Sequence, residues 1–331
     1  MKKSSLKILF IKRGSTRFEN NDINLLNDRF DLKIHEPNLF SFFELVGLIY
    51  NTDIIYYWFP NDYKFILSII AKLFSKKIYI VGGGQMSTAD NSSNRKFANV
   101  NYRFFHIPLG ILSLKIADKV IAVSKYEMKG LSRYVNPNKL KLIYNSIDTS
   151  KFNLQNFLRD DNLIVTVSAL KNTHYHRKGL DTFIRISKLF PKKKFFIIGK
   201  DHGDGTYDKI KNLKSSNLFL KGFVDDFELI SILNQASVYC QFSRQEGFGV
   251  SLAEAIACGC IPLTTDYAAI PEVSGPDGYY IDRYPDDKNL KDTLKRALNA
   301  GVNERKNNSS RVVELFDHNK RKNLLYNEFD I

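Results

Sequence analysis

The stretch that decides the fold covers residues 239–273, YCQFSRQEGFGVSLAEAIACGCIPLTTDYAAIPEV. It continues a short apolar run, 236–242, that is typical of a buried strand, and glycines at 247 and 249 end that pattern. From 250 to 258 the apolar residues recur at helical spacing, and Gly259 follows as a C-cap residue would. Residues 261–265 predict the next strand. Strand, glycine-rich loop, helix and strand together make a βαβ unit.

The loop that precedes this predicted helix is a candidate phosphate site. The first backbone N–H groups of a helix have no partner within it, and the positive end of the helix dipole favours a phosphate oxygen. Gly247 and Gly249 would let a ligand approach the backbone closely. Glu246 and Glu254 flank the site, and carboxylates beside a phosphate are used in dinucleotide folds to accept hydrogen bonds from sugar hydroxyls. The spacing equally allows Glu246 to cap the helix and Glu254 to be a solvated helix residue.

Four motifs in register, E-G-F-G, A-E-A, C-G and P-E-V, make this segment specific. It resembles the donor-binding signature of family 4 of the retaining glycosyltransferases, also described as group 1. The resemblance implies that Glu254 holds the ribose hydroxyls of a nucleotide and that Glu246 acts as a catalytic contact to the donated sugar. It also implies that backbone amides meet the diphosphate, those of Gly247, Phe248, Gly249 and Val250.

A second part of the resemblance lies in the segment KNTHYHRKG, residues 171–179. Lys178 and Gly179 match a lysine-glycine pair of the family, in which the lysine clamps the diphosphate and assists catalysis. The family's arginine position falls on Ala169, and Lys171 or Arg177 are the candidates to replace it. Two cations would neutralise the charge on a leaving diphosphate, so no metal or other cofactor is expected. The histidines of this segment, His174 and His176, are interpreted as loop residues.

Further matches are looser. Gly222 and Phe223 fall at the family's loop against the nucleotide base and are candidate donor contacts. The first loop of the chain usually holds paired glycines that approach the donor, and only Gly14 is present here. Many members of the family have a histidine or an acidic residue beside the donor sugar. Gln85 and Asp90 stand near this position here, and neither is assigned a catalytic role.

Length and composition limit the class of protein. With 331 residues, 44% of them hydrophobic and 25% charged, the chain has the size of two soluble globular domains. No run of 18 apolar residues predicts a membrane-spanning helix, and the apolar run near the N-terminus is too short for a signal peptide. The odd number of cysteines predicts small buried thiols in a reducing compartment. We therefore expect a cytoplasmic protein.

The net charge of +14 is unevenly spread. Residues 1–150 hold 22 of the 49 Lys and Arg but only 12 of the 35 Asp and Glu. Because no nucleic-acid-binding motif accompanies this excess, an anionic membrane surface is preferred to nucleic acid as a partner, with a merely solvated face as the alternative. Residues 39–50 predict a core-facing helix, or else a helix whose aromatics enter a bilayer interface. In the second case nearby lysines would meet lipid headgroups, namely Lys64, Lys72, Lys76 and Lys77.

Strands alternate with helices through two halves of comparable size. This predicts the α/β class and, with the resemblance, a GT-B fold of two doubly wound, Rossmann-like parallel sheets facing a cleft. Residues 1–150 would form an acceptor-side domain and 151–316 a nucleotide-sugar-binding domain. Residues 317–331 would form a terminal helix that crosses back to the first. A polar loop is expected over 12–21, a mobile loop over 91–103 and a linker over 149–162.

The predicted function is retaining transfer of a sugar from a UDP- or GDP-linked donor to an acceptor hydroxyl. A lipid-linked or glycan acceptor at the cytoplasmic face of a membrane is preferred because of the charge asymmetry. Two alternatives stay open. One is a nucleotide-sugar-binding protein without transfer activity, and the other is an epimerase or hydrolase of nucleotide sugars on the same fold.

Overall fold

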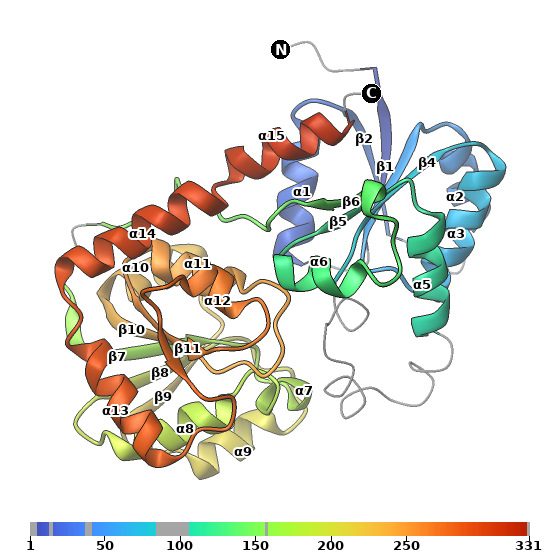
Figure 1. Ribbon diagram of the computed structural model, residues 1–331. Coiled ribbons are helices and arrows are strands. Elements are labelled where there is room, and N and C mark those ends of the chain that lie inside the picture. The colour runs from blue at the N-terminus through green and yellow to red at the C-terminus, as the bar shows by residue number, and fades with distance from the viewer. Residues whose placement is uncertain (1–4, 13–15, 37–41, 84–105, 156–157, 330–331) are drawn as a thin grey trace. The chain divides into compact units, whose positions relative to one another are not determined.

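The computed structural model describes residues 5–12, 16–36, 42–83, 106–155 and 158–329 (Figure 1). The chain divides into two compact units, one made of Met1–Ser146 with His318–Ile331 and the other of Ile147–Asp317. The division lies close to the boundaries that the sequence suggests, 150/151 and 316/317. Gly14, Gln85, Asp90 and the segment 91–103 lie outside the described residues.

The described part of the first unit contains a six-stranded parallel sheet in the order β2-β1-β3-β4-β5-β6. Its central strand, IIYYW, is buried at every position, which is expected of a parallel strand covered on both faces. Every residue of that strand is apolar or aromatic for this reason. The strands are β1 (Lys7–Ile11), β2 (Asp31–His35), β3 (Ile54–Trp58), β4 (Lys77–Val81), β5 (Lys119–Ala122) and β6 (Leu140–Leu142).

Helices cover this sheet (Figure 1). They are α1 (Arg17–Asn27), α2 (Phe42–Tyr50), α3 (Asp62–Leu73), α5 (Ile107–Ile116), α6 (Lys125–Leu131), the short 3₁₀ turn η3 (Pro137–Lys139) and α15 (His318–Phe329). The polar loop predicted over 12–21 is wrong in its second half, where α1 begins at Arg17. The polar first turns hid this helix, because its buried face gains apolar residues only at Leu25 and Leu26.

The C-terminal helix α15 is fastened to the first unit by a buried ion pair. The Arg321 guanidinium donates to both carboxylate oxygens of Asp22 in α1, over 2.7 and 2.8 Å. Tyr56 Oη and Trp58 Nε1 in β3 donate to the same carboxylate, over 2.6 and 2.9 Å. The side chains of Arg321 and Asp22 are 1% and 0% exposed, so this charge pair is compensated entirely within the protein.

One residue of the membrane alternative does not fit it. Lys64 was a candidate to meet lipid headgroups in that alternative, yet it is 3% exposed. Its ammonium donates to the backbone carbonyl of Trp58 and, over 3.4 Å, to that of Phe59. Lys64 faces inward because it lies in the first turn of α3, on the side of the helix that packs against the end of β3.

The second unit contains, in the part that the structure describes, another six-stranded parallel sheet, in the order β12-β11-β10-β7-β8-β9. The predicted linker over 149–162 ends earlier than expected, because β7 already begins at Asp160. The strands are β7 (Asp160–Val167), β8 (Lys194–Ile198), β9 (Leu218–Gly222), β10 (Ala236–Gln241), β11 (Ile261–Thr265) and β12 (Tyr279–Ile281).

The helices of the second unit pack on this sheet around one apolar core. They are α7 (Asn172–Tyr175), α8 (Leu180–Leu189), α9 (Thr206–Leu213), α10 (Asp226–Gln235), α11 (Val250–Ala257), α12 (Ile270–Ser274), α13 (Asp287–Leu298) and α14 (Val302–Phe316). The α/β class with two doubly wound parallel sheets is thereby confirmed. The three cysteines are free and buried. In the described parts of the chain, no helix combines the length and apolarity needed to cross a bilayer.

Candidate functional site

The predicted donor residues of the second unit gather at the carboxyl edge of its sheet. In the strand order, β7 continues to β8 and β9 on one side, while β10 lies on its other side. The direction in which successive strands are added across the sheet therefore reverses between β7 and β10. Open α/β sheets bind ligands at such a topological switch point. The segment after β7 carries Lys178, and the segment after β10 carries Glu246. Pairing of the two strands brings these side chains together across 68 positions of sequence.

Lys178 and Glu246 form an ion pair at this edge. The Lys178 ammonium donates to Oε2 of Glu246, and Gln241 Nε2 donates to the same oxygen over 3.3 Å. The two charged side chains are 23% and 14% exposed. Burial acts to raise the pKa of Glu246, but the charges of Lys178 and Arg177 and the hydrogen bonds from Lys178 and the Gly247 amide outweigh it. The pKa of Glu246 is therefore lowered, and its carboxylate stays ionised at neutral pH.

The backbone next to Lys178 requires a glycine at position 179, because any other residue there would distort the backbone. Gly179 has a φ of +70°, and a Cβ atom there would lie 2.1 Å from the carbonyl oxygen of Phe242. Phe242 directly follows β10, so the lysine-bearing segment packs against the segment that carries Glu246. Gly179 thus permits the close approach that the ion pair requires.

Arg244 joins the same two segments and was not identified from the sequence. Its guanidinium donates to both carboxylate oxygens of Asp181, over 3.1 and 2.9 Å, and to the carbonyl of His176 over 2.6 Å. Its own amide donates to the carbonyl of Arg177 over 2.8 Å. A bidentate arginine fixes direction as well as distance, so Arg244 positions the backbone on both sides of Lys178. An arginine in a polar loop has no sequence signal that reveals such a partner.

The glycine-rich loop enters helix α11 as the sequence predicts. Gly249, with a φ of +104°, is the N-cap residue of α11, and no side chain caps this helix. Glu246 therefore does not cap it. Phe248 is 3% exposed and packs edge-on against Phe316, with ring centroids 5.0 Å apart. Because its ring faces the protein interior, only the backbone groups of Phe248 are placed to contact a ligand.

Glu254 lies inside α11 and is 4% exposed, so the alternative of a solvated helix residue is wrong. A buried carboxylate on a helix behind a glycine-rich loop is costly unless it accepts hydrogen bonds. Its charge acts to raise the pKa of the Tyr239 hydroxyl in β10, after the larger effect of burial. The charge of Glu246 acts on the same hydroxyl in the same direction.

The remaining predicted residues are distributed around this edge. Gly222 ends β9 with a φ of +71°, and its carbonyl accepts a hydrogen bond from the Gly199 amide over 2.8 Å. The side chain of Phe223, the next residue, is 77% exposed. Lys171 is exposed at the start of α7. Of the two candidates to replace the family's arginine, Arg177 is the one whose charge acts on Glu246.

His174 in α7 belongs to this charged group, which the sequence interpretation as a loop histidine did not anticipate. Its Nδ1 is buried without a hydrogen-bond partner. The pKa of His174 is lowered to about 4, first by burial and then by the charges of Arg177, Lys178 and Lys171. The charge of Glu246 opposes this shift and is outweighed. The imidazole is therefore neutral at pH 7.

This lowered pKa predicts a specific pH dependence of stability. Between the ordinary histidine pKa of about 6.5 and the folded value of about 4, the unfolded chain binds a proton that the folded protein does not. The free energy of unfolding should fall as the pH falls through this window and level off below it. In His174→Gln this part of the slope should disappear, as measured by urea unfolding from pH 7.5 to pH 4. An unchanged slope would contradict the assignment, and His202→Gln, an exposed histidine on the loop after β8, is the control.

Across the described residues, no cluster of three or more His, Cys, Asp or Glu side chains is arranged to hold a metal ion. The groups gathered at this edge are cations, a paired carboxylate, a buried carboxylate and a glycine-rich helix N-terminus. Such a set suits an anionic ligand that also carries hydroxyl groups.

Comparison with known families agrees with this chemistry. Residues 148–313 match the model of the family described as "Glycosyl transferases group 1". The chain belongs to this family. The resemblance seen in residues 239–273 is thereby confirmed. The matched segment covers nearly the whole second unit and includes every predicted donor residue of that unit.

Among similar curated proteins, one component of the phosphatidylinositol N-acetylglucosaminyltransferase of Arabidopsis thaliana is 24% identical over 226 residues. The alignment covers 65% of this chain and 50% of that protein, so the chain spans about half the length of this relative.

Similar solved structures extend over the whole chain. Anabaena HepE, in complex with UDP and glucose, aligns over 98% of this chain and 99% of its own, with a TM-score of 0.76 and 13% identity. Sucrose-phosphate synthase from Thermosynechococcus elongatus aligns over 98% of both chains with the same TM-score and 14% identity. At these identities the likeness concerns the fold, which is GT-B.

Proposed function

We propose that this protein transfers a sugar from a nucleotide diphosphate sugar to an acceptor hydroxyl, with retention of the anomeric configuration. The observation that carries the proposal is the Lys178–Glu246 pair beside the glycine-rich entrance to α11, at the switch point of the second sheet. A diphosphate needs cations and backbone amides, and a sugar needs a hydrogen-bond acceptor. This edge of the sheet supplies all three.

In the proposed reaction, the bond between the sugar and the diphosphate breaks and its electrons go to the departing phosphate oxygen. The oxygen of the acceptor hydroxyl forms the new bond to the anomeric carbon on the same face of the sugar, and its proton passes to the departing phosphate oxygen. Lys178 and Arg177 neutralise the charge that develops there, together with the N–H groups at the start of α11. Lys178 would then exchange its bond to Glu246 for a bond to the diphosphate. Glu246, kept ionised by its neighbours, would accept a hydrogen bond from a hydroxyl of the sugar. These residues do not require a metal ion for this task.

Glu254 is proposed to hold the ribose hydroxyls, because it is a buried carboxylate behind the phosphate-binding loop. The exposed ring of Phe223 is proposed to lie against the base. The base itself is uracil or guanine in this proposal. The UDP complex of HepE supports a uridine nucleotide, since that protein shares the fold over nearly its whole length.

The donor site is tested by thermal shift with UDP, GDP, ADP and their sugars. A ligand that binds only the folded state raises the melting temperature by mass action. One nucleotide should therefore stand out for the wild type, and Glu254→Gln should lose that response relative to its own ligand-free melting temperature. Glu228→Gln, at an exposed position of α10, is the matched control. If no nucleotide shifts the wild type at millimolar concentration, or Glu254→Gln responds fully, the donor assignment is wrong.

The transfer itself is tested by following the fate of the sugar. Incubation of the identified nucleotide sugar with membrane extracts should give a product in which the anomeric configuration of the donor is kept. Release of free sugar at the same rate without acceptor would instead indicate a hydrolase, and binding without turnover would indicate a nucleotide-sugar-binding protein.

We also propose that the acceptor is lipid-linked or part of a growing glycan, and that the protein works at an anionic membrane surface. One support is a relative whose name includes the lipid phosphatidylinositol. Another is a surface of the first unit formed by α2, α3 and α5, where α3 packs against both other helices (Figure 1). The large apolar side chains that this surface exposes are Phe43 (88%), Leu73 (77%), Tyr50 (62%), Ile66 (50%), Ile69 (41%), Leu112 (41%) and Phe74 (36%).

Charge favours an anionic bilayer as the partner of this surface. Lys76 follows α3, Lys77 begins β4 and Lys115 lies in the last turn of α5. The Lys76 ammonium stands 5.8 Å from the centroid of the exposed Tyr50 ring. Lys72 is half-exposed and is paired with Asp118 over 2.7 Å. Apolar side chains next to accessible lysines are typical of a surface that enters the headgroup region.

The membrane proposal is tested by cosedimentation with vesicles of phosphatidylcholine with or without phosphatidylglycerol. Binding should require phosphatidylglycerol, and Ile69→Asn/Leu73→Glu should reduce the bound fraction at least tenfold. Leu213→Glu, an exposed leucine on α9 of the second unit, is the control. Equal binding of the α3 variant and the wild type would refute this surface, and a concentration-dependent dimer that the variant abolishes would assign it to self-association.

A further inference from the structure

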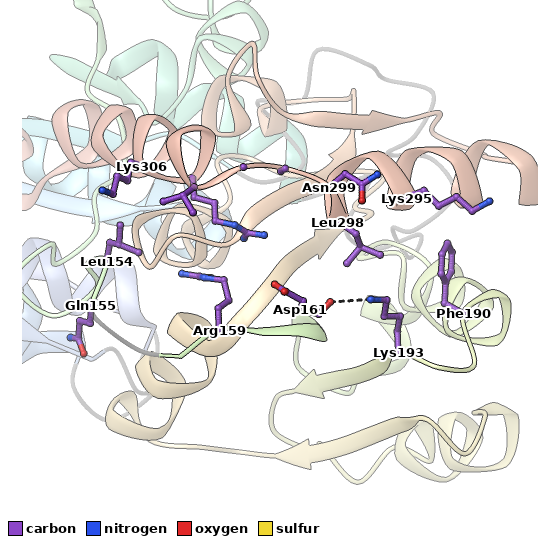
Figure 2. A pocket seen from close by; sticks show the side chains of 14 residues that line it. Leu154, Gln155, Arg159, Asp161, Phe190, Lys193, Lys295, Leu298, Asn299 and Lys306 are labelled. Atoms are coloured by element: carbon purple, nitrogen blue, oxygen red, sulfur yellow. Dashed lines mark hydrogen bonds between the residues drawn. The ribbon is translucent and has the colours of Figure 1, made fainter.

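The second unit has a cavity of about 850 Å³ at the edge of its sheet opposite the donor residues. Arg159 and Asp161, at the start of β7, lie on one side of it, and Leu298 and Asn299, at the end of α13, lie on the other (Figure 2). The donor residues follow the other end of β7, which is a strand of eight residues. At about 3.3 Å per residue the two edges are about 25 Å apart. The cavity is therefore a separate site.

The lining of this cavity is strongly cationic. Five basic side chains contribute to it, from Arg159, Lys193, Lys295, Arg305 and Lys306, against the single carboxylate of Asp161. Lys193 donates to the Asp161 carbonyl over 3.1 Å and to the Asn162 side chain over 2.9 Å. Lys295 and Lys306 extend from α13 and α14 into the solvent.

Two of these cations are held side by side without a carboxylate partner among the described residues. The Arg159 guanidinium donates to the carbonyls of Ala236 and Cys258, and the Arg305 guanidinium to those of Ser237 and Gly259. Because these are adjacent pairs of peptide groups, both guanidiniums bridge the start of β10 and the turn that follows α11. Burial first, and then the charge of Arg159, lower the pKa of Arg305. The carboxylates of Asp161 and Glu304 oppose this shift but do not cancel it, so an anion in the cavity would relieve the remaining repulsion between the two guanidiniums.

The rest of the lining is mixed, because Gln155 and Asn299 are polar and the other side chains are apolar. The Phe190 ring and the Leu298 and Val302 side chains line the cavity with the basic groups. Each guanidinium has five N–H groups, and the carbonyl bonds leave some of them available to a ligand. A cavity of this size, in which cationic groups stand beside an apolar wall, has the dimensions of a small-molecule site.

We propose that this cavity binds a small organic phosphate, its phosphate group on Arg159 and Arg305 and its apolar part against Phe190 and Leu298. Lys295 and Lys306, at the rim of the cavity, add positive charge around the site. The same two arginines hold the C-terminal end of α11, whose N-terminal end carries the glycine-rich loop. A phosphate in the cavity thus binds behind the helix that faces the donor site, and does not compete with the donor.

The test uses phenyl phosphate, with inorganic phosphate and phenol as the separate halves of the probe, in isothermal titration calorimetry. Wild type should bind phenyl phosphate more tightly than either half. The variant Lys295→Glu/Lys306→Glu changes two exposed side chains and should weaken this binding at least tenfold. Lys129→Glu/Lys211→Glu, which makes the same charge change at exposed positions of α6 and α9, should bind as the wild type does.

The donor-site variant Lys178→Ala separates this inference from the proposed function, because it should leave phenyl phosphate binding unchanged. Absence of binding at millimolar concentration, equal weakening in the control pair, or weakening by Lys178→Ala alone would each overturn the assignment. Cosedimentation with phosphatidylglycerol vesicles identifies the source of the phosphate. If Lys295→Glu/Lys306→Glu also loses vesicle binding, the phosphate belongs to a lipid headgroup, and if only phenyl phosphate binding is lost, it belongs to a soluble metabolite.

Discussion

Lys178→Ala should lower kcat for sugar transfer by about 10²–10³-fold, because a preorganised donor at a developing charge typically contributes this much. The ammonium is partly buried and already held at the site by Glu246, so little reorganisation is needed when the diphosphate departs. Initial rates with saturating donor measure the effect. Lys188→Ala, at an exposed position of α8 ten residues after Lys178, should keep the wild-type rate.

The same variant predicts a pH signature that a purely structural role would not give. Burial acts to raise the pKa of Glu246, and the charge and hydrogen bond of Lys178 oppose it. Without Lys178 the pKa of Glu246 should rise, so the acid limb of the pH–rate profile should move to higher pH in the variant. A kcat within threefold of wild type, or a reduced kcat with an unmoved acid limb, would remove Lys178 from the proposed role.

Arg321→Ala should destabilise the first unit by about 3–5 kcal/mol, because removing one member of a buried ion pair leaves the other charge uncompensated. Asp22 would remain buried with only Tyr56 and Trp58 as donors. Trp58 is the single tryptophan of the chain and belongs to this network, so its fluorescence during urea unfolding reports on this unit directly.

The neighbouring residue supplies a matched control. Lys322 in α15 also pairs with a carboxylate of the α1 region, Asp28, over 2.7 Å, but the two side chains are 29% and 58% exposed. Exposed pairs contribute at most about 1 kcal/mol, so Lys322→Ala should shift the urea midpoint only slightly. Equal shifts of the urea midpoint in the two variants would show that burial of the Arg321–Asp22 pair does not increase its contribution to stability. Asp22→Asn/Arg321→Met should recover part of the loss, since it removes both charges.

The local sequence pattern was sufficient to predict most helices and strands of the second unit. The alternation of strand and helix, the glycine-rich loop and the start of α11 follow from spacing and from residues with special backbone requirements, which act within a few positions. Elements with weak local patterns were missed or misplaced. The segment containing α1 has polar first turns, and the structure places a further helix, α9, that the sequence did not indicate.

The environment of each side chain depended on contacts that the sequence does not record. Lys64 and Lys72 lie on the same short helix, yet the first is buried against the backbone after β3 and the second is half-exposed beside Asp118. Glu254 could be solvated or buried by spacing alone, and packing decided it. Packing likewise decided the hydrogen-bond partners of Arg244 and the burial of His174.

By itself, the sequence determined the family, the α/β class and the set of residues that carry the donor signature, because these depend on residue type and spacing within short segments. Only the tertiary structure decided which charges meet. Lys178 and Glu246 are 68 positions apart, and Arg321 and Asp22 are 299 apart. Parallel strand pairing and helix packing bring such groups together, and the free energy of each charge then depends on its burial and its partner.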